Sequence, residues 1–481
     1  MDEPLYKRDV TVASAAPLTA AQVIEDLSLA REVLETVHPG YDRYTPARTL
    51  DAAWDVRLAD ASEIEDTGAL YLALSEVLTL IRCDHTKAET PREMERARTE
   101  NASFFPFRLM TDGDAAIIYS TDEGSPFQKG DKLISIDGRP ASQVISDVLS
   151  LIPVDGQTDH VKPVQFESTG EFLGSGFEHF YPLLYGDWEE ATVTIARGGE
   201  QMDVVAQPIT WEAWRAMPWP GNQYRPDFVD SVELDINQDG VAVLTVDTFV
   251  NYRRPVDPDT VYRPLFETLR EENITSLILD TRENGGGSTD AMLGLLAYLI
   301  DEPTTLFQWK RVRTIDVTEY ADYINVWDPR ALKPDPSNFN RLDDGWFELK
   351  PQADPLSLQP FDPKEPQFEG DLIVLTSASN ASGVALMLAT LQEKGAATLV
   401  GEKTGGSAEG PTAGILYSLK LPNSGIVVRV PWQLQRSIVA NPPLGKGVTP
   451  DVLIRPSIND RLDGRDRVLE EALRLASRRE P

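Results

Sequence analysis

Two stretches of sequence decide the fold of this chain. They are LILDTRENGGGS, residues 277–288, and LIVLTSASNASG, residues 372–383, which runs on towards GEKTGG, residues 401–406. Each begins as a short apolar run, stops at small polar residues and is followed by a helix-period stretch, a pattern typical of a buried parallel strand, a tight turn and a helix. Ligands bind at such turns because the N–H groups of helix N-termini point outward there. A serine placed beside bare amides indicates acyl transfer.

The two stretches resemble the signature of the S41 peptidases, the family of C-terminal processing proteases and tricorn-like proteases. The first motif, strand-Asp-x-Arg-x-Asn-Gly-Gly-Gly, matches from Leu277 to Gly287, and Gly-Glu-x-Thr-x-Gly matches from Gly401. Ser382 falls on the family's nucleophile, since it precedes Gly401 by 19 residues, which is the family's own spacing. The resemblance, which covers 232 to about 456, implies a multidomain α/β protein with a crotonase/ClpP-like protease core.

Composition narrows the class of protein. A chain of 481 residues is expected to hold two to three domains, and 41% hydrophobic residues supply an ordinary core. The net charge of −32 argues against a nucleic-acid partner. No apolar run approaches the about 18 residues that a membrane span needs. The single cysteine, Cys83, excludes an internal disulfide and a Cys-rich metal site, and no metal or other cofactor is implied.

The cellular compartment is an expectation from the resemblance alone. The N-terminus is polar and carries no apolar core of a signal peptide. Related S41 enzymes are commonly exported, which predicts an extracytoplasmic protein, periplasmic or secreted, whose export signal is absent from this sequence.

The secondary structure that the sequence predicts changes along the chain. After a tail, a helical segment begins at a capping box of Thr19 and Gln22. A β-rich stretch follows, in which residues 130–138 resemble the signature of bacterial PDZ domains. We predict these divisions: a tail, 1–17; an N-terminal helical domain, 18–100; a PDZ-like module, 104–210, with an insertion, 142–185; and the catalytic core, 228–481, with an irregular proline-rich excursion, 302–368.

Ser382 is the predicted nucleophile. It comes directly after a strand and at the start of a helix, where the N-terminus stabilises a developing negative charge and the N–H of Gly383 can donate to an oxyanion. The glycine turn supplies a second donor by resemblance to the family, Gly286 in preference to Gly285. Two structural alternatives remain open: Ser382 could be only an N-cap, and the glycines could serve only the turn.

The general base is predicted from a short list. Relatives of the Ser-Lys type carry lysine 25 residues after the serine, and this chain has Ser407 there, which disfavours a dyad with Lys394 or Lys403. The tricorn-like branch uses a histidine from before the core. Of His38, His85, His160 and His179, His85 in Asp84-His85-Thr86 matches that branch's pattern. A histidine is the fitting base for a serine.

The orienting acid has no direct match. The family's glutamate before the Pro-Asp close is replaced by Leu444, and its glutamate after the nucleophile by Ala385. Glu409 is the nearest substitute, and Asp84 is its rival.

The predicted function is therefore that of a serine endopeptidase acting on peptides or unfolded proteins. A non-catalytic ligand carrier on the same fold, which the missing acids would suit, and a small-substrate esterase or amidase are the alternatives. Aromatic residues of the excursion are candidates to line the cleft: Trp309, Tyr320, Tyr323, Trp327 and Trp346.

Overall fold

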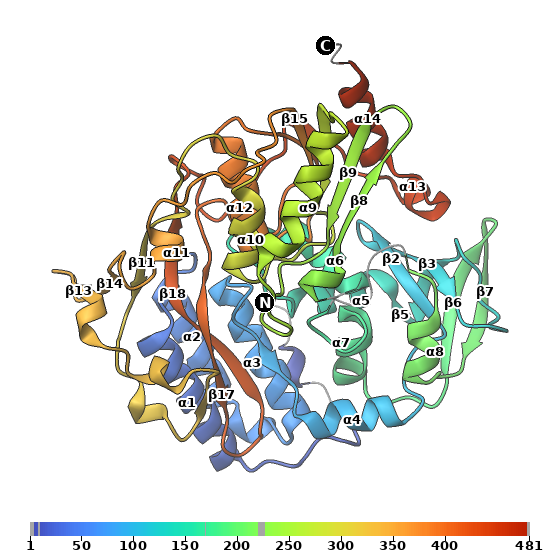
Figure 1. Cartoon of the computed structure of the whole chain (residues 1–481). Coiled ribbons are helices and arrows are strands. Elements are labelled where there is room, and N and C mark those ends of the chain that lie inside the picture. Colours follow the sequence, from blue (N-terminus) through green and yellow to red (C-terminus); the bar gives the residue numbers. More distant parts are fainter. Residues whose placement is uncertain (1–3, 8–9, 169, 220–226, 479–481) are drawn as a thin grey trace.

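The computed structural model describes residues 4–7, 10–168, 170–219 and 227–478. The predicted tail lies partly outside the described residues, as do residues 479–481 of the predicted core. Four groups of elements make up the described chain: a largely parallel sheet with its helices, a seven-stranded antiparallel sheet, a group of N-terminal helices, and a β-rich module (Figure 1).

The largely parallel sheet contains both signature strands. Its order is β19-β16-β15-β10-β9-β8, and only β8 runs antiparallel to its neighbour. Leu277 lies opposite Leu372, so the two signature strands are adjacent and in register. The strands are β8 (Val232–Ile236), β9 (Val241–Val246), β10 (Ser276–Asp280), β15 (Asp371–Thr376), β16 (Thr398–Gly401) and β19 (Val452–Leu453).

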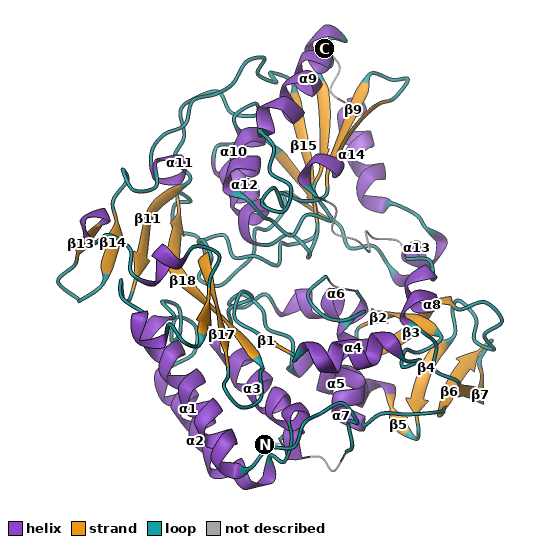
Figure 2. Ribbon diagram, turned by 60° about the horizontal axis from the view of Figure 1, so that its bottom comes forward, coloured by secondary structure: helices purple, strands orange, loops and turns teal. Residues whose placement is uncertain are grey.

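Helices cover both faces of this sheet. Leu277 and Leu279 pack in one cluster with helices on one side, while Ile278 packs on the other side in a cluster with Ala472. Burial on both faces explains why the signature strands are apolar without alternation. Figure 2 shows α10 and α12 on one side of β15 and α14 on the other. The covering helices are α9 (Pro258–Glu271), α10 (Thr289–Leu296), α12 (Ser382–Glu393) and α14 (Arg467–Arg478). The short α13 (Ile458–Asp463), which precedes α14, contacts the β-rich module instead.

The stretch 302–368 is irregular only in part. It supplies β11, β12, β13 and β14 to a second sheet of order β12-β17-β18-β11-β14-β13, to which β1 adds beside β18. The prolines of this stretch lie between its strands and none lies within one. The stretch as a whole therefore has the composition of a loop, which is why the sequence did not indicate the strands. The bounds are β1 (Ala88–Glu89), β11 (Phe307–Val312), β12 (Ile324–Asn325), β13 (Phe339–Arg341), β14 (Phe347–Leu349), β17 (Thr412–Lys420), β18 (Val427–Ser437) and the short α11 (Pro355–Leu358).

Helices occupy most of residues 20–100 and pack against the second sheet. The predicted capping box is confirmed: the Thr19 side chain accepts from the Gln22 N–H, and Gln22 caps Thr19 in return. In Figure 1 the blue helices lie beside the orange strands β17 and β18, although more than 300 residues separate them, and α1 contacts β18. The helices are α1 (Ala20–Val37), α2 (Ala47–Ala59), α3 (Thr67–Ile81) and α4 (Arg92–Glu100).

The β-rich module has a sheet of order β2-β3-β4-β6-β7, with β5 beside β4. Asp137 and Gly138 both have positive φ at the turn between β4 and β5, as an Asp-Gly hairpin requires. Residues 142–185 form helices that pack on this sheet and on each other. The bounds are β2 (Phe107–Asp112), β3 (Ala115–Thr121), β4 (Lys132–Ile136), β5 (Arg139–Pro140), β6 (Ala191–Arg197), β7 (Glu200–Ala206), α5 (Ala141–Ser150), α6 (Lys162–Glu167), α7 (Gly176–Tyr185) and α8 (Trp211–Ala216).

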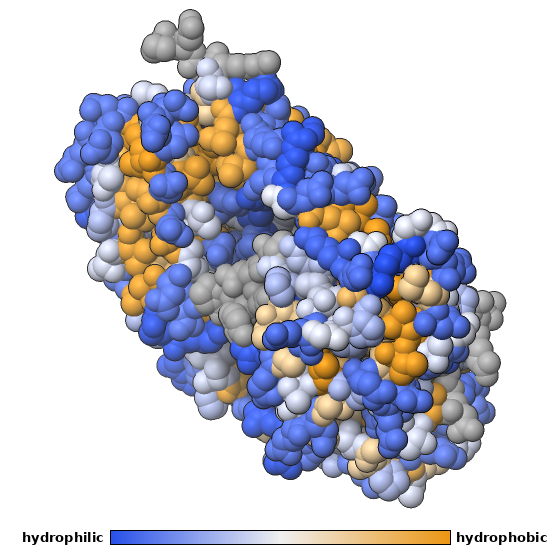
Figure 3. Space-filling view, turned by 90° about the vertical axis from the view of Figure 1, so that its right-hand side faces the viewer, coloured by the Kyte–Doolittle hydropathy of each residue, from blue (hydrophilic) through white to orange (hydrophobic). Residues whose placement is uncertain are grey.

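The surface and helices of the described chain agree with its composition. The face in Figure 3 is largely hydrophilic, with hydrophobic patches broken up by polar residues. Among the described residues, no helix is both long enough and apolar enough to cross a bilayer.

Candidate active site

Two buried asparagines join the signature turns. Asn380 Nδ2 donates to the carbonyl oxygens of Thr281 and Asn284, the latter at 3.0 Å, and Asn380 Oδ1 accepts from the Ser377 N–H at 2.8 Å. Asn284 Nδ2 donates to the carbonyl of Val246 at 3.0 Å, which ties the glycine turn to β9. Both asparagines are fully buried. Because their amides satisfy backbone groups that the strands leave unpaired, the turns after β10, β15 and β9 are held as one unit.

Ser382 is the first residue of α12 and has left-handed backbone geometry. Its φ is 50°, and the N-cap position belongs to Ala381, whose side chain makes no capping bond. The alternative that Ser382 is only an N-cap is therefore wrong. The Ser382 side chain makes no hydrogen bond with any residue that the structure describes, and the residue is half-buried. A non-glycine residue held at positive φ, with an unengaged hydroxyl at a helix N-terminus, makes Ser382 the candidate nucleophile.

The glycine turn packs directly on Ser382. Gly286 is buried with φ 102°, and a Cβ there would lie 2.9 Å from both Ser382 Cβ and the Gly383 nitrogen, so only glycine fits. However, the Gly286 N–H donates to Asn284 Oδ1 at 2.8 Å. In this conformation Gly286 is not a free oxyanion donor, contrary to the preference from the sequence. Gly285 and Gly287 are exposed neighbours in the same turn, and Gly383 holds an N–H of the first helical turn.

His85 lies in the loop between α3 and β1. It is half-buried, and its Nδ1 atom is buried without a hydrogen-bond partner. Cys83, His85 and Asp155 each present one S, N or O atom, and these three atoms lie within 4.8 Å of one another. Asp155 Oδ1 accepts the backbone N–H of Asp84 at 3.0 Å, while Asp155 Oδ2 is buried and unpaired. The loop 83–86 and Asp155 thus form one polar cluster.

The electrostatics of this cluster disfavour negative charge. Burial and the neighbouring Asp84 raise the pKa of the Asp155 carboxyl, and the opposing effect of His85 is smaller than that of burial. Burial also raises the pKa of the Cys83 thiol to about 12. Nothing in the sequence pointed to Asp155, because it belongs to no motif and lies in the stretch interpreted as an insertion.

The other three histidines have structural partners. His38 is fully buried between Thr86 Oγ1, 2.7 Å from Nε2, and the Gly40 N–H, 3.0 Å from Nδ1; burial lowers its pKa to about 3. Its Thr86 contact braces the loop of His85. His160 Nε2 donates to the carbonyls of Lys403 and Thr404, and burial lowers its pKa. These positions leave His85 as the histidine available for chemistry.

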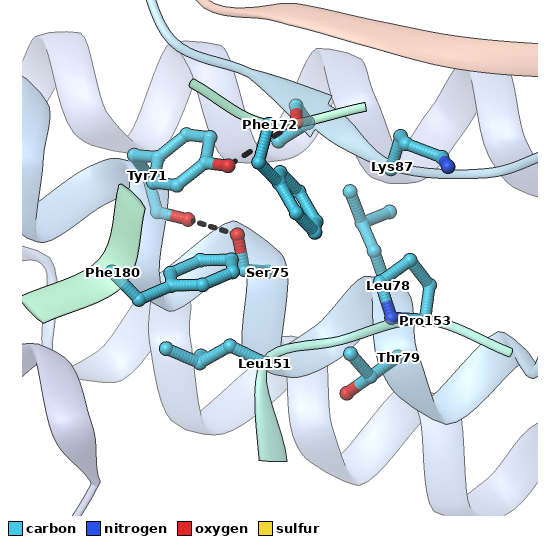
Figure 4. Close-up of a pocket in the computed structure, with 10 residues that line it drawn as sticks. Tyr71, Ser75, Leu78, Thr79, Lys87, Leu151, Pro153, Phe172 and Phe180 are labelled. Atoms are coloured by element: carbon cyan, nitrogen blue, oxygen red, sulfur yellow. Dashed lines mark hydrogen bonds between the residues drawn. The ribbon is translucent and has the colours of Figure 1, made fainter. Parts of the chain in front are cut away.

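His179 is a core residue behind this loop. Its Nε2 lies 2.9 Å from Tyr71 Oη, and burial lowers its pKa to about 3. Figure 4 shows the adjacent pocket, where Tyr71 and Phe180 face Lys87 and Pro153, and Ser75 Oγ donates to the Tyr71 carbonyl at 2.8 Å. This packing anchors both segments that carry the cluster, residues 83–88 and 151–155.

Glu409 belongs to a different network. It is 1% exposed, with Oε1 accepting the Tyr44 hydroxyl at 2.6 Å and Oε2 accepting the Gly445 N–H at 2.7 Å, and Arg43 lies 3.1 Å away. It is therefore not a solvated loop carboxylate. Among the described residues no hydrogen bond joins it to His85, so its role as the orienting acid stays a prediction. Asp84, its rival, faces Lys87 at 3.6 Å.

Residues that follow Asp155 in the chain contact the loop 403–406, and Ser382 lies against the same loop. His160 and Val161 contact residues 403–405, and a Cβ on Gly406 would lie 2.9 Å from the Ser382 nitrogen. Asp155 begins the segment that carries His160. Within the described residues, no hydrogen bond joins Ser382 to His85. Lys394 pairs with Glu302 at 2.8 Å, and it does not reach Ser382.

The aromatic residues of 302–368 do not form one lining. Tyr320 is buried and its hydroxyl donates to Glu32 at 3.0 Å, so it packs this region onto α1. Trp309 and Trp346 stack with Arg311 and Arg313. Tyr323 and Trp327 are exposed, by 36% and 80%, and are the members of the set open to a ligand.

A serine hydroxyl at a helix N-terminus, with a glycine turn packed beside it, is an arrangement typical of serine-type hydrolases. Residues 240–454 match the model described as peptidase family S41. No curated protein matches the sequence. Among solved structures, mature CPAF complexed with lactacystin is 14% identical over 95% of this chain and 98% of that one, with a TM-score of 0.64. Mature CPAF is 15% identical over 95% and 96%, with a TM-score of 0.60. Both share the fold along nearly the whole length.

Proposed function

We propose that this protein is a serine endopeptidase that hydrolyses peptides or unfolded proteins with Ser382 as the nucleophile. One observation carries the proposal: Ser382 is held at φ 50° on the first residue of α12, its hydroxyl unengaged, with the glycine turn against it. The tetrahedral oxyanion would be stabilised by the Gly383 N–H and the dipole of α12, with a second donor from the glycine turn. Gly285 and Gly287 fit that second role better than Gly286, because the Gly286 N–H donates to Asn284 Oδ1.

His85 is the proposed general base. It would take the Ser382 proton and return it to the leaving amine. The support is its half-exposed position and the engagement of the other three histidines. Because proton transfer needs an approach of about 3 Å, the proposal requires the His85 ring to reach the Ser382 hydroxyl in the complex with substrate.

Asp155 is proposed as the positioning residue for His85. Its unpaired Oδ2 atom and the unpaired His85 Nδ1 are buried in one cluster, and a small shift would pair them. An aspartate at Nδ1 holds the neutral ring with its proton on that nitrogen, so that Nε2 can accept from serine. Glu409 and Asp84 remain alternatives to this assignment.

The other segments are proposed to form the walls of the substrate groove. Residues 18–100 would act as an N-terminal helical domain that delivers His85, and residues 104–210 as a PDZ-like module. Arg461 of α13 donates to Glu167 of α6 at 3.1 Å, which supports a PDZ-like module held against the core. The net charge of −32 favours basic peptides over nucleic acid. By resemblance to exported relatives, we also propose an extracytoplasmic location.

The test is covalent labelling by a fluorophosphonate probe. The wild type should be labelled and Ser382→Ala should not, while Ser379→Ala, three residues earlier on the same loop, should label normally. An unbiased peptide library should then be cleaved. Absence of labelling with an intact fold would favour a ligand carrier, and hydrolysis restricted to small esters would favour an esterase. Preference for acidic residues around the cut would contradict the electrostatic part.

A further inference from the structure

We propose that Cys83, His85 and Asp155 form a binding site for a zinc ion that switches the enzyme off. A thiol, an imidazole and a carboxylate within 4.8 Å of one another are three of the ligand types that zinc takes in proteins. The inhibitory half of this inference rests on the proposed function, in which His85 is the base. The binding half does not, because it depends only on the three side chains.

The cluster leaves buried polar atoms without partners. His85 Nδ1 and Asp155 Oδ2 are both buried and unpaired, and Asp155 as a whole is 4% exposed. Cys83 is 2% exposed, and its Sγ lies 3.6 Å from the Thr412 carbonyl oxygen. Buried polar atoms are nearly always paired in folded proteins. A cation between these three side chains would satisfy all of them together.

The protein frame already holds the ligands close to a metal geometry. Asp155 Oδ1 is fixed by the Asp84 N–H, which leaves Oδ2 to bind a metal through one oxygen. The Gly156 N–H donates to the Arg82 carbonyl at 2.9 Å, and the Thr86 N–H to that of Cys83 at 3.0 Å, so both loops are braced. Zinc bonds of about 2.0–2.3 Å at tetrahedral angles put neighbouring ligand atoms about 3.3–3.8 Å apart. Closure by roughly 1.5 Å or less completes three positions and leaves the fourth for water.

The chemistry of the three ligands favours zinc at this place. Zinc binding would release the Cys83 thiol proton as the S–Zn bond forms. A sulfur and a nitrogen ligand select zinc over calcium or magnesium, which prefer oxygen.

The consequence for catalysis follows from the two nitrogens of His85. A metal on Nδ1 displaces the proton of the neutral ring to Nε2. The ring then has no lone pair to accept the Ser382 proton, and the contact with Asp155 that positions it is also lost. Removal of zinc restores the base.

The binding test uses the full chain carrying Ser382→Ala, which cannot digest itself. Titration with Co²⁺ should produce the near-ultraviolet band of a thiolate–cobalt bond, and calorimetry should show one Zn²⁺ per chain. Adding Cys83→Ser should abolish the band, and adding Asp155→Asn should weaken zinc binding at least tenfold. Asp159→Asn, an acid four residues away outside the cluster, should leave it unchanged. Thermal unfolding of each variant checks its fold, and zinc should raise the melting temperature only where the three ligands are intact.

The activity test uses the enzyme with Ser382 intact. Equimolar zinc should abolish peptide cleavage, and a chelator should restore it. In Cys83→Ser the zinc concentration for half-inhibition, measured against that variant's own zinc-free rate, should rise at least tenfold. Failure to bind zinc, or equal binding without Cys83 and Asp155, would overturn the site. Binding without inhibition would overturn the switch alone. A chain that binds zinc but never cleaves peptides would refute the proposed function and leave the site standing.

Discussion

Asn380 Nδ2 donates to the Asn284 carbonyl at 3.0 Å, and this bond joins the serine turn to the glycine turn across 96 residues of sequence. The same amide nitrogen donates to the Thr281 carbonyl, so one side chain fixes the distance between the two turns. The relative position of the serine turn and the glycine turn thus depends on a buried asparagine.

Asn380→Ala should destabilise the protein by about 2–4 kcal/mol, because it leaves buried carbonyls unpaired. The loss should appear in urea unfolding, together with a fall in kcat as the turns separate. Ser379→Ala, next to it in the same loop and half-buried, is the matched control and should change stability by less than about 0.5 kcal/mol. Equal effects at the two positions would show that the asparagine bridge has no special role.

Ser382→Gly should be inactive and yet more stable than Ser382→Ala by about 1 kcal/mol, because only glycine adopts φ 50° without strain. Differential scanning calorimetry of the two variants measures the difference. A less stable glycine variant would mean that Ser382 is not strained.

His85→Ala should lower kcat by about 10³-fold or more with the fold intact, as losses of a triad base do. Lys403→Ala should leave kcat nearly unchanged. Steady-state kinetics of both variants on a cleaved peptide distinguish a histidine base from a lysine base. The reverse result would establish a Ser-Lys enzyme instead.

Asp155→Asn should lower kcat by about 10²–10⁴-fold with KM unchanged, because asparagine can stabilise the wrong ring tautomer. A change in the bell-shaped pH–rate profile would separate this positioning role from a structural one.

Glu409→Gln is the variant to compare with Asp155→Asn. It weakens the link to Arg43, Tyr44 and Gly445, so stability should fall while kcat stays within about tenfold of the wild type. A large loss of kcat at Glu409 with none at Asp155 would restore Glu409 as the orienting acid.

Glu178 should make stability fall as pH rises. Burial raises the pKa of its carboxyl to about 8, so between about pH 4 and 8 the folded state holds a proton that the unfolded chain releases. Stability then declines through that window, by up to about 1.4 kcal/mol per pH unit from this group. Glu178→Gln should remove that part of the slope, as urea unfolding at several pH values would reveal. An unchanged slope would mean that Arg98 keeps Glu178 ionised.

Local sequence predicted the elements whose pattern is strong. The apolar runs of β10 and β15 and the capping box of α1 were read directly from residue order. The strands of 302–368 were missed, because they are short, separated by prolines, and stabilised by pairing with β17 and β18 far along the chain. Strand propensity depends on such partners more than on the strand itself.

The sequence by itself determined the parallel core, the serine at the start of a helix and the glycine turn that packs on it, because strand, turn and helix periodicities are local properties. Only the tertiary structure decided which acid lies beside His85. Asp155 is 70 residues from His85 and carries no motif, and it reaches the histidine loop because the Asp84 N–H and the packing around Pro153 hold it there. The tertiary structure also engaged Glu409 with Tyr44 and Arg43. Side chains brought together by long-range packing leave no periodic trace in the order of residues.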